Sequence, residues 1–177
     1  GGDFARLERL AAAVALREDL PMFVPHLGGR VCPAQPDLRG AWVGLTWDHG
    51  AAELYRAVLE GVALEYGVYQ EALGRLYGQS MIRELRVTGG GQHSRLWNAI
   101  KADMLQVPLR RVDRSEGAPL GSAMVAGWGV GVLKSLPVAA KQWIALGEAV
   151  RPNKSLAPYY ARRLCRYQWL LGHLGQW

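Results

Sequence analysis

The sequence predicts an α/β fold, a single domain whose sheet is covered by helices on both faces. Two observations support this prediction. In the second half of the chain, short apolar segments that end at glycine or proline alternate with longer segments that repeat apolar residues every three or four positions, a pattern typical of strands that alternate with helices. The chain is also long enough, at 177 residues with 50% hydrophobic residues, to bury a core of its own.

The first half is expected to contain two helices and two short strands. Apolar residues fall on one stripe between residues 3 and 18, which predicts an amphipathic helix that ends before Pro21. Glycines and prolines then divide the chain into shorter segments. The remaining elements of this half are a strand at 22–27, a loop at 30–40, a strand at 41–45 and a long helix at about 50–77.

Three residues of the long helix depart from its apolar pattern. Gly61 and Gly67 lack a Cβ atom, so a neighbouring element could approach the helix closely there. Glu65 places a carboxylate near the same seam and is the one discordant residue of the stripe. A further interpretation is that Gly61, Gly67 and the aromatic last helix form a homodimer surface.

The second half is expected to alternate strands with helices. Leu85 and Val87 alternate with polar residues, as in a half-buried strand, and Ser94 is a residue type that caps helix N-termini. The elements are a strand at 84–87, a helix from Ser94 to about residue 105, a strand at 107–112, and helices at 118–132, 137–146 and 156–174.

Several classes of protein are disfavoured. The uncharged segment 117–133 contains one proline and five glycines, so a buried helix and loop explain it better than a membrane span. The net charge of +6 is scattered along the chain and no nucleic-acid motif occurs, which argues against nucleic-acid binding. Two cysteines and four separated histidines match neither a disulfide framework nor a metal site. We therefore expect a cytoplasmic protein without a metal site of its own.

The segment that suggests chemistry is Gly89-Gly90-Gly91, which follows one strand and precedes one helix. Without Cβ atoms these residues can adopt positive φ and let a ligand touch the main chain. The next helix presents unpaired N–H groups and the positive end of its dipole, which suit phosphate or ring-nitrogen acceptors. A nucleotide at this turn is reasonable, but tight strand–helix packing explains the glycines equally well, because no Walker A lysine follows and the Rossmann spacing is absent.

Three segments together resemble the FGGY family of carbohydrate kinases. Residues 40–45 and 53–60, separated by seven residues, fit the family's second signature. Residues 87–94 resemble its adenosine motif, and residues 118–123 with Ala126-Gly127 resemble its small-residue helix. The order and separations agree with the family, and the resemblance extends over essentially the whole chain. Within the family the sequence is most similar to xylulokinase-like members.

The resemblance implies a ribonuclease H-like, actin-type ATPase domain with a mixed sheet, in which two related halves close over ATP and sugar. Residues 1–177 would then be the C-terminal nucleotide-binding domain of a sugar kinase. Such a kinase transfers the γ-phosphoryl group of ATP to a hydroxyl of xylulose or a related ketose or polyol, with Mg²⁺ held by ligands outside this chain. The implied partners are the N-terminal half of the same kinase, ATP and the sugar.

The resemblance also assigns roles to single residues. The expected nucleotide-binding residues are Gly89, Gly90, Gly91, Gln92, Ser94 and Arg95. The first four would line the adenine and ribose side, with main-chain contacts at Gly90 and Gly91, and the last two would flank the base. Gly121 would let its helix pack closely behind the site, and Glu60 is expected to form a structural ion pair or helix cap.

Two departures from the family are visible. Its Asp-x-Gly-Thr phosphate loop and its catalytic aspartate do not occur in these residues, so no catalytic residue is assigned and the chain alone is expected to be inactive. Residues 27–31, Leu-Gly-Gly-Arg-Val, stand where members often have Ser-Gly-Glu-Arg-Thr. The alternative is a non-catalytic nucleotide-binding or regulatory module with a kinase-like fold.

Overall fold

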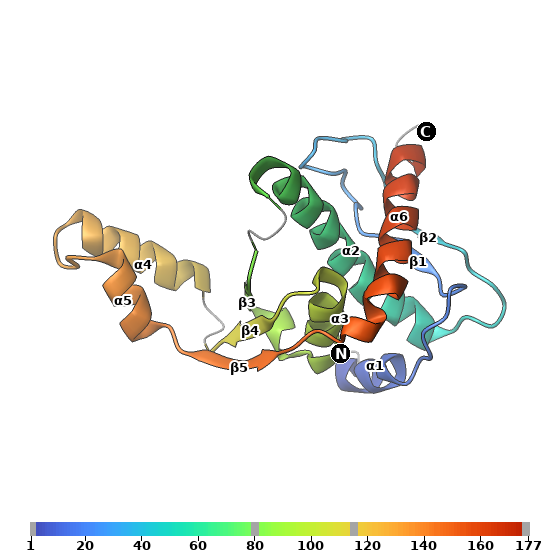
Figure 1. Ribbon diagram of the computed structural model, residues 1–177, viewed down its shortest axis with the longest axis horizontal. Coiled ribbons are helices and arrows are strands. Elements are labelled where there is room, and N and C mark those ends of the chain that lie inside the picture. Colours follow the sequence, from blue (N-terminus) through green and yellow to red (C-terminus); the bar gives the residue numbers. More distant parts are fainter. Residues whose placement is uncertain (1–2, 79–81, 114–116, 175–177) are drawn as a thin grey trace.

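The computed structural model describes residues 3–78, 82–113 and 117–174 (Figure 1). The helices and strands follow one another in the order α1 (Phe4–Ala12), β1 (Met22–Val24), β2 (Ala41–Val43), α2 (Ala51–Tyr77), β3 (Leu85–Val87), the 3₁₀-helix η1 (Gly90–His93), α3 (Arg95–Leu105), β4 (Leu109–Val112), α4 (Gly117–Gly129), α5 (Leu136–Trp143), β5 (Leu146–Val150), the 3₁₀-helix η2 (Lys154–Leu156) and α6 (Ala157–Leu174).

The strands form two small sheets. β1 and β2 pair antiparallel, and in the second sheet, of order β3-β4-β5, β4 pairs parallel with β3 and antiparallel with β5. The predicted α/β class and mixed sheet are therefore confirmed, although the strands are divided between two sheets. β5 was not predicted, because Leu146–Val150 contains a glycine and shows little alternation. Its pairing with β4 supplies the order that its own sequence does not indicate.

The core forms around α2, which packs against α1, β1, α3 and α6. Leu64 on α2 and Ile100 on α3 are each 1% exposed, as is Tyr160 on α6. Burial of side chains of this size typically contributes about 1.5–3 kcal/mol each. The helix that the sequence predicts at 50–77 is thus the element on which the rest of the chain assembles.

Gly61 and Gly67, two of the three glycines of α2, allow close approach within the chain, as predicted. A Cβ atom on Gly61 would collide with the carbonyl oxygen of Phe23 on β1, and one on Gly67 would collide with Met104 on α3. Both glycines are buried inside the chain. The homodimer surface that the sequence suggested cannot include them, and that part of the interpretation is wrong.

Glu65, the discordant residue of α2, is the centre of a buried polar cluster. Its carboxylate accepts hydrogen bonds from Arg30 Nε at 2.8 Å and from the Tyr167 hydroxyl at 2.9 Å, and it lies 3.2 Å from His26 Nε2. Burial raises the pKa of Glu65, but hydrogen bonds from Tyr69 and Tyr167 and the charge of Arg30 together outweigh that effect. The pKa of Glu65 is therefore lowered overall. The cluster ties the loop after β1 to α2 and α6.

Glu60 forms the ion pair that was expected of it. Arg56 Nε donates to its Oε1 atom at 2.9 Å, and Arg163 Nε lies 2.9 Å from its Oε2 atom. All three side chains are buried. A buried charge is tolerated when such partners surround it, and this explains how a carboxylate occupies the apolar face of α2.

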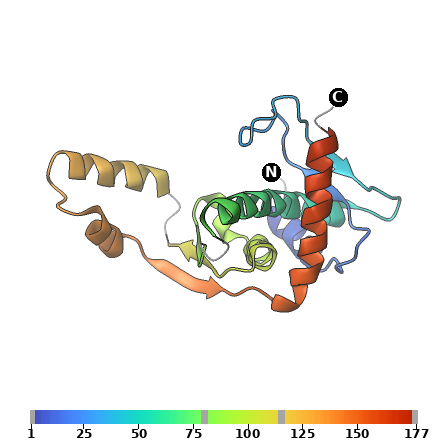
Figure 2. The same ribbon diagram turned by 45° about the horizontal axis from the view of Figure 1, so that its top comes forward.

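α4 and α5 extend away from the rest of the molecule (Figures 1 and 2). The helix at 118–132 is confirmed in position, but its predicted burial is wrong: Val125 is 57% and Trp128 54% exposed, and only Met124 is buried. A Cβ atom on Gly121 would meet nothing within 4 Å, so the close packing expected there is absent among the described residues. None of the described helices is long and apolar enough to cross a membrane.

Candidate nucleotide site

The glycine turn leaves main chain open to a ligand. Gly89 has φ +83°, in the region that favours glycine, and Gly90 and Gly91 begin the 3₁₀-helix η1. A Cβ atom on Gly89 or Gly90 would meet no atom within 4 Å, whereas one on Gly91 would enter the ring of Trp97. The turn is therefore packed on its Gly91 side and uncovered at Gly89 and Gly90.

Two hollows flank this turn. The first, the α1 hollow, measures about 590 Å³ and is lined by Ala5, Glu8, Arg9, Ala12, His93, Arg95 and Leu96. The second, the Lys101 hollow, measures about 410 Å³ and is lined by Tyr66, Leu85, Arg86, Val87, Thr88, Gly91, Gln92, Trp97 and Lys101. Both volumes lie in the range of small-molecule pockets.

The six predicted residues do not all face the same hollow. Arg95 lines the α1 hollow, while Gly91 and Gln92 line the Lys101 hollow. Gln92 is 3% exposed, and its carbonyl accepts from Asn98 Nδ2 at 2.7 Å. Ser94 caps α3 as predicted, because its Oγ atom accepts from the N–H of Trp97 at 3.0 Å.

A carboxylate occupies the N-terminus of α3. Glu8 Oε1 accepts from Ser94 Oγ at 3.0 Å and from the N–H of Leu96 at 3.1 Å. The sequence suggested that this helix end suits phosphate or ring-nitrogen acceptors, but Glu8 already satisfies the N–H group of Leu96 and its charge repels an anion such as phosphate. Glu8 lies on α1, 86 residues from Ser94, and no local pattern indicated the contact.

The residues around the turn do not suit Mg²⁺. Magnesium prefers an octahedral shell of oxygens, often with one or two carboxylates. Glu8 is the one carboxylate among the described residues that line the two hollows, and it already accepts two hydrogen bonds from the protein. No group of three or more His, Cys, Asp and Glu side chains able to hold a metal occurs in the described ranges.

Lys101 is a further residue at the turn that the sequence did not single out. Its side chain is 4% exposed, and its Nζ atom lies 4.4 Å from the centroid of the Trp97 ring. Burial lowers the pKa of Lys101 from 10.5 to about 8. In sequence it occurs as one more charged position of an amphipathic helix, so nothing local indicates its burial.

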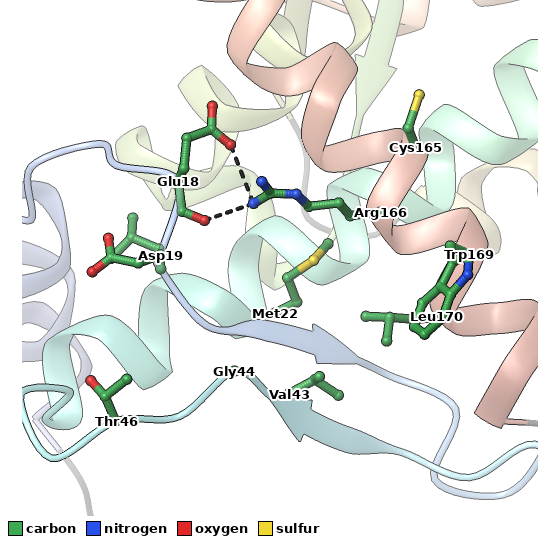
Figure 3. Close-up of a pocket in the computed structure, with 11 residues that line it drawn as sticks. Glu18, Asp19, Met22, Val43, Gly44, Thr46, Cys165, Arg166, Trp169 and Leu170 are labelled. Atoms are coloured by element: carbon green, nitrogen blue, oxygen red, sulfur yellow. Dashed lines mark hydrogen bonds and ion pairs between the residues drawn. The ribbon is translucent and has the colours of Figure 1, made fainter.

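A third hollow, of about 630 Å³, lies between residues 18–22, the end of β2 and α6 (Figure 3). Its wall is mostly apolar and includes Trp169 and Leu170. Its main charged groups satisfy one another, since Arg166 donates to the carbonyl of Glu18 at 2.8 Å and lies 3.3 Å from its carboxylate. None of the predicted site residues lines this hollow.

The comparison with known families settles the relationship of the chain. The model of the C-terminal domain of the FGGY family of carbohydrate kinases matches residues 2–130, well over half of the chain. The chain belongs to the FGGY family. The turn at Gly89–Gly91 and its two hollows lie within the matched residues.

Curated relatives in the FGGY family include two kinds of kinase. The xylulose kinase of Staphylococcus epidermidis is 29% identical over 167 residues, which are 93% of this chain and 33% of that protein. The glycerol kinase of Geobacter sp. (strain M21) is 39% identical over 148 residues, which are 83% of this chain and 29% of that protein. The chain thus spans about a third of the length of these relatives.

Solved FGGY kinases share the fold. The crystal structure of xylulose kinase from Rhodospirillum rubrum aligns with a TM-score of 0.78 and 30% identity, over 97% of this chain and 34% of that one. The ligand-bound xylulose kinase from Lactobacillus acidophilus aligns with a TM-score of 0.81 at 23% identity. The predicted actin-type ATPase fold is confirmed.

Proposed function

We propose that residues 1–177 are the C-terminal nucleotide-binding domain of a cytoplasmic, ATP-dependent sugar kinase. The complete enzyme would transfer the γ-phosphoryl group of ATP to a hydroxyl of xylulose or a related ketose or polyol. The observation that carries this proposal is the uncovered main chain at Gly89 and Gly90, which precedes His93 and Arg95 of the α1 hollow along the chain, in a chain that matches the FGGY C-terminal domain. The xylulose and glycerol kinases among its relatives support the substrate class.

The adenosine part of ATP fits the α1 hollow better than its phosphates do. Glu8 lines the hollow, and its Oε2 atom has no hydrogen-bond donor among the described residues. A carboxylate oxygen repels phosphate but accepts a hydrogen bond from the exocyclic amine of adenine. Arg95, in the same hollow, supplies a planar guanidinium that can stack on the base. The uncovered main chain at Gly90 can then contact the ribose or the base edge.

The N-terminal half of the kinase is the proposed partner, and it would supply the phosphate loop, the base and the Mg²⁺ ligands. Phosphoryl transfer depends on positioning and charge neutralisation by such groups, so the chain alone would not turn over. The exposed apolar residues of α4 and α5, such as Val125 and Trp128, are suited to burial against that half, because contiguous exposed apolar surface often marks an interface.

Activity assays on the complete protein test the function. We expect ATP-dependent phosphorylation of D-xylulose or a related polyol by the complete protein and none by the 177-residue chain. The absence of phosphorylation of every ketopentose and polyol would refute the kinase proposal. Tight ATP binding without turnover would favour the non-catalytic regulatory module instead.

Gly90→Ala tests the position of the nucleotide. The added Cβ atom meets no protein atom within 4 Å, so the fold should not change, but it covers the main chain that we propose contacts the nucleotide. We expect ATP affinity, measured by calorimetry on the complete protein, to fall about tenfold or more. Gly172→Ala is the matched control, since a Cβ atom there would also meet no atom within 4 Å and the residue lies on α6, outside the three hollows. Unchanged affinity in Gly90→Ala would place the nucleotide elsewhere.

Glu8→Gln tests whether the Glu8 carboxylate recognises the adenine base. The amide can keep the acceptor that bonds Ser94 and Leu96, while its NH₂ group presents a donor to the hollow. We expect the ratio of ATP to GTP affinity to shift about tenfold toward GTP, whose base carries an oxygen at that position. Arg9→Gln, in the same hollow, should leave the ratio unchanged. An unchanged ratio in Glu8→Gln would show that Glu8 does not contact the base.

A further inference from the structure

The Lys101 hollow contains a largely buried cation that has no counter-ion among the described residues. Tyr66 reaches the hollow from α2, Arg86 and Thr88 from β3, Gln92 from η1, and Lys101 itself from α3. No carboxylate lines the hollow within the described ranges, and no hydrogen bond or ion pair joins Lys101 to another described residue. The face of the Trp97 ring, 4.4 Å from Nζ, is its electrostatic partner.

The energetic cost of this arrangement can be relieved by an anion. The Lys101 side chain is mostly removed from water, and no acceptor in the described residues replaces the water that its ammonium has lost, so an anion that enters from solvent would stabilise the charged form. The hollow leaves about 410 Å³ for such an anion. Arg86 adds little attraction, because it is exposed and already lies 3.3 Å from Glu84. Lys101 is therefore the charge that an incoming ligand would meet.

The remaining wall of the Lys101 hollow is largely apolar, which indicates that the rest of the ligand is apolar as well. Tyr66 and Trp97 present aromatic surface, and Leu85 and Val87 present aliphatic surface. Tyr66 is 43% exposed, so an apolar group placed against it would remove that surface from water. An inorganic ion would pair with Lys101 but leave this wall uncovered, whereas a ligand with an apolar body would use both.

We propose that the Lys101 hollow binds a small organic anion, a carboxylate or phosphate monoester with an apolar body, whose charged group pairs with the ammonium of Lys101. The site differs from the one proposed for adenosine, which lies in the α1 hollow lined by Glu8 and Arg95. It does not depend on kinase activity. The Lys101 hollow adjoins the glycine turn, since the Trp97 ring beneath Lys101 also packs against Gly91.

Lysine-selective NMR provides the test, because the chain has only four lysines, Lys101, Lys134, Lys141 and Lys154. The protein is labelled with [¹³C]lysine and titrated, without nucleotide, with phenyl phosphate, with benzoate and with the neutral analogue benzyl alcohol. We expect both anions to move the Lys101 signal saturably and to raise the midpoint of its pH titration by about one unit or more, while the other three signals stay in place. Benzyl alcohol should leave that midpoint unchanged.

Lys101→Met and Lys141→Met complete the test by calorimetry with phenyl phosphate. We expect the affinity to fall about tenfold or more in Lys101→Met and to be unchanged in Lys141→Met, whose lysine is exposed. The proposal is overturned if all four lysine signals move alike, if benzyl alcohol raises the Lys101 midpoint as much as benzoate does, or if Lys101→Met binds phenyl phosphate as well as the wild type. The NMR result on the wild type decides the question even if Lys101→Met does not fold.

Discussion

Replacing Arg163 with methionine is expected to reduce the free energy of unfolding by about 3–5 kcal/mol. Arg163 is 1% exposed and connects three parts of the chain. Its Nη1 and Nη2 atoms donate to the carbonyls of Leu20 and Pro21 at 3.1 and 2.8 Å, and its Nε atom lies 2.9 Å from Glu60. Methionine fills much of the volume but satisfies none of these acceptors.

The expected loss is large because the partners remain buried. Among the described residues Glu60 would keep only Arg56 as a cationic neighbour, and two buried carbonyls before β1 would lose their donors, which costs about 1–3 kcal/mol for each unsatisfied group. A domain of this kind has a total stability of about 5–15 kcal/mol. The variant should therefore unfold at much lower urea concentration, as followed by circular dichroism at pH 7.

Arg162→Met is the matched control for Arg163→Met. Arg162 is the preceding residue, but its side chain is exposed and pairs with Glu18 at 2.7 Å on the surface. Exposed ion pairs contribute about 0–1 kcal/mol, so this variant should unfold close to the wild type. Similar losses of stability in the two variants would contradict the role assigned to the buried network.

The sequence predicted local structure well where the signal was local. The cap at Ser94 is confirmed, because a serine before an apolar helical repeat bonds a main-chain N–H two or three residues later. The close approach at Gly61 is confirmed as well, since only glycine lets a neighbour come so near. In both cases the residue type restricts the backbone directly, whatever the rest of the chain does.

Contacts between distant segments could not be predicted in the same way. Glu65 was recognised as discordant, but its partner Tyr167 comes from α6, 102 residues later. Glu8 reaches the end of α3 across 86 residues. A single sequence contains no signal that pairs these positions, because each contact depends on how helices pack rather than on spacing along the chain.

The burial of α4 was predicted wrongly for a related reason. The apolar composition of residues 117–133 shows that a surface should be covered, but not which segment covers it. Within the described ranges α4 packs mainly on α5, and Trp128 stays exposed. Covering that face is a role we propose for the other half of the kinase.

Lys101→Met is expected to make the chain more stable at pH 7, by about 2 kcal/mol once solvent screening of the amine is allowed for, and this gain should shrink as the pH rises. In the folded chain burial lowers the pKa of Lys101 from 10.5 to about 8. Below pH 8 the folded state bears the full cost of a buried ammonium. Between about pH 8 and 10.5 the unfolded chain binds more protons than the folded chain, so the free energy of unfolding of the wild type rises with pH.

The measurement is confined to pH 7–9.5, in buffers free of carboxylate and phosphate, which could pair with Lys101. Above that window the ionisation of buried tyrosines also changes the stability. Burial raises the pKa of Tyr159 to about 12, so the contribution of Tyr159 to stability is lost as the tyrosine of the unfolded chain ionises from about pH 10 upward. The free energies of unfolding of the wild type and Lys101→Met, measured with urea, should therefore approach each other between pH 7 and 9.5. Lys141→Met replaces an exposed lysine, so its free energy of unfolding should change with pH as that of the wild type does. A constant difference between Lys101→Met and the wild type would mean that the Lys101 amine keeps its proton throughout this window.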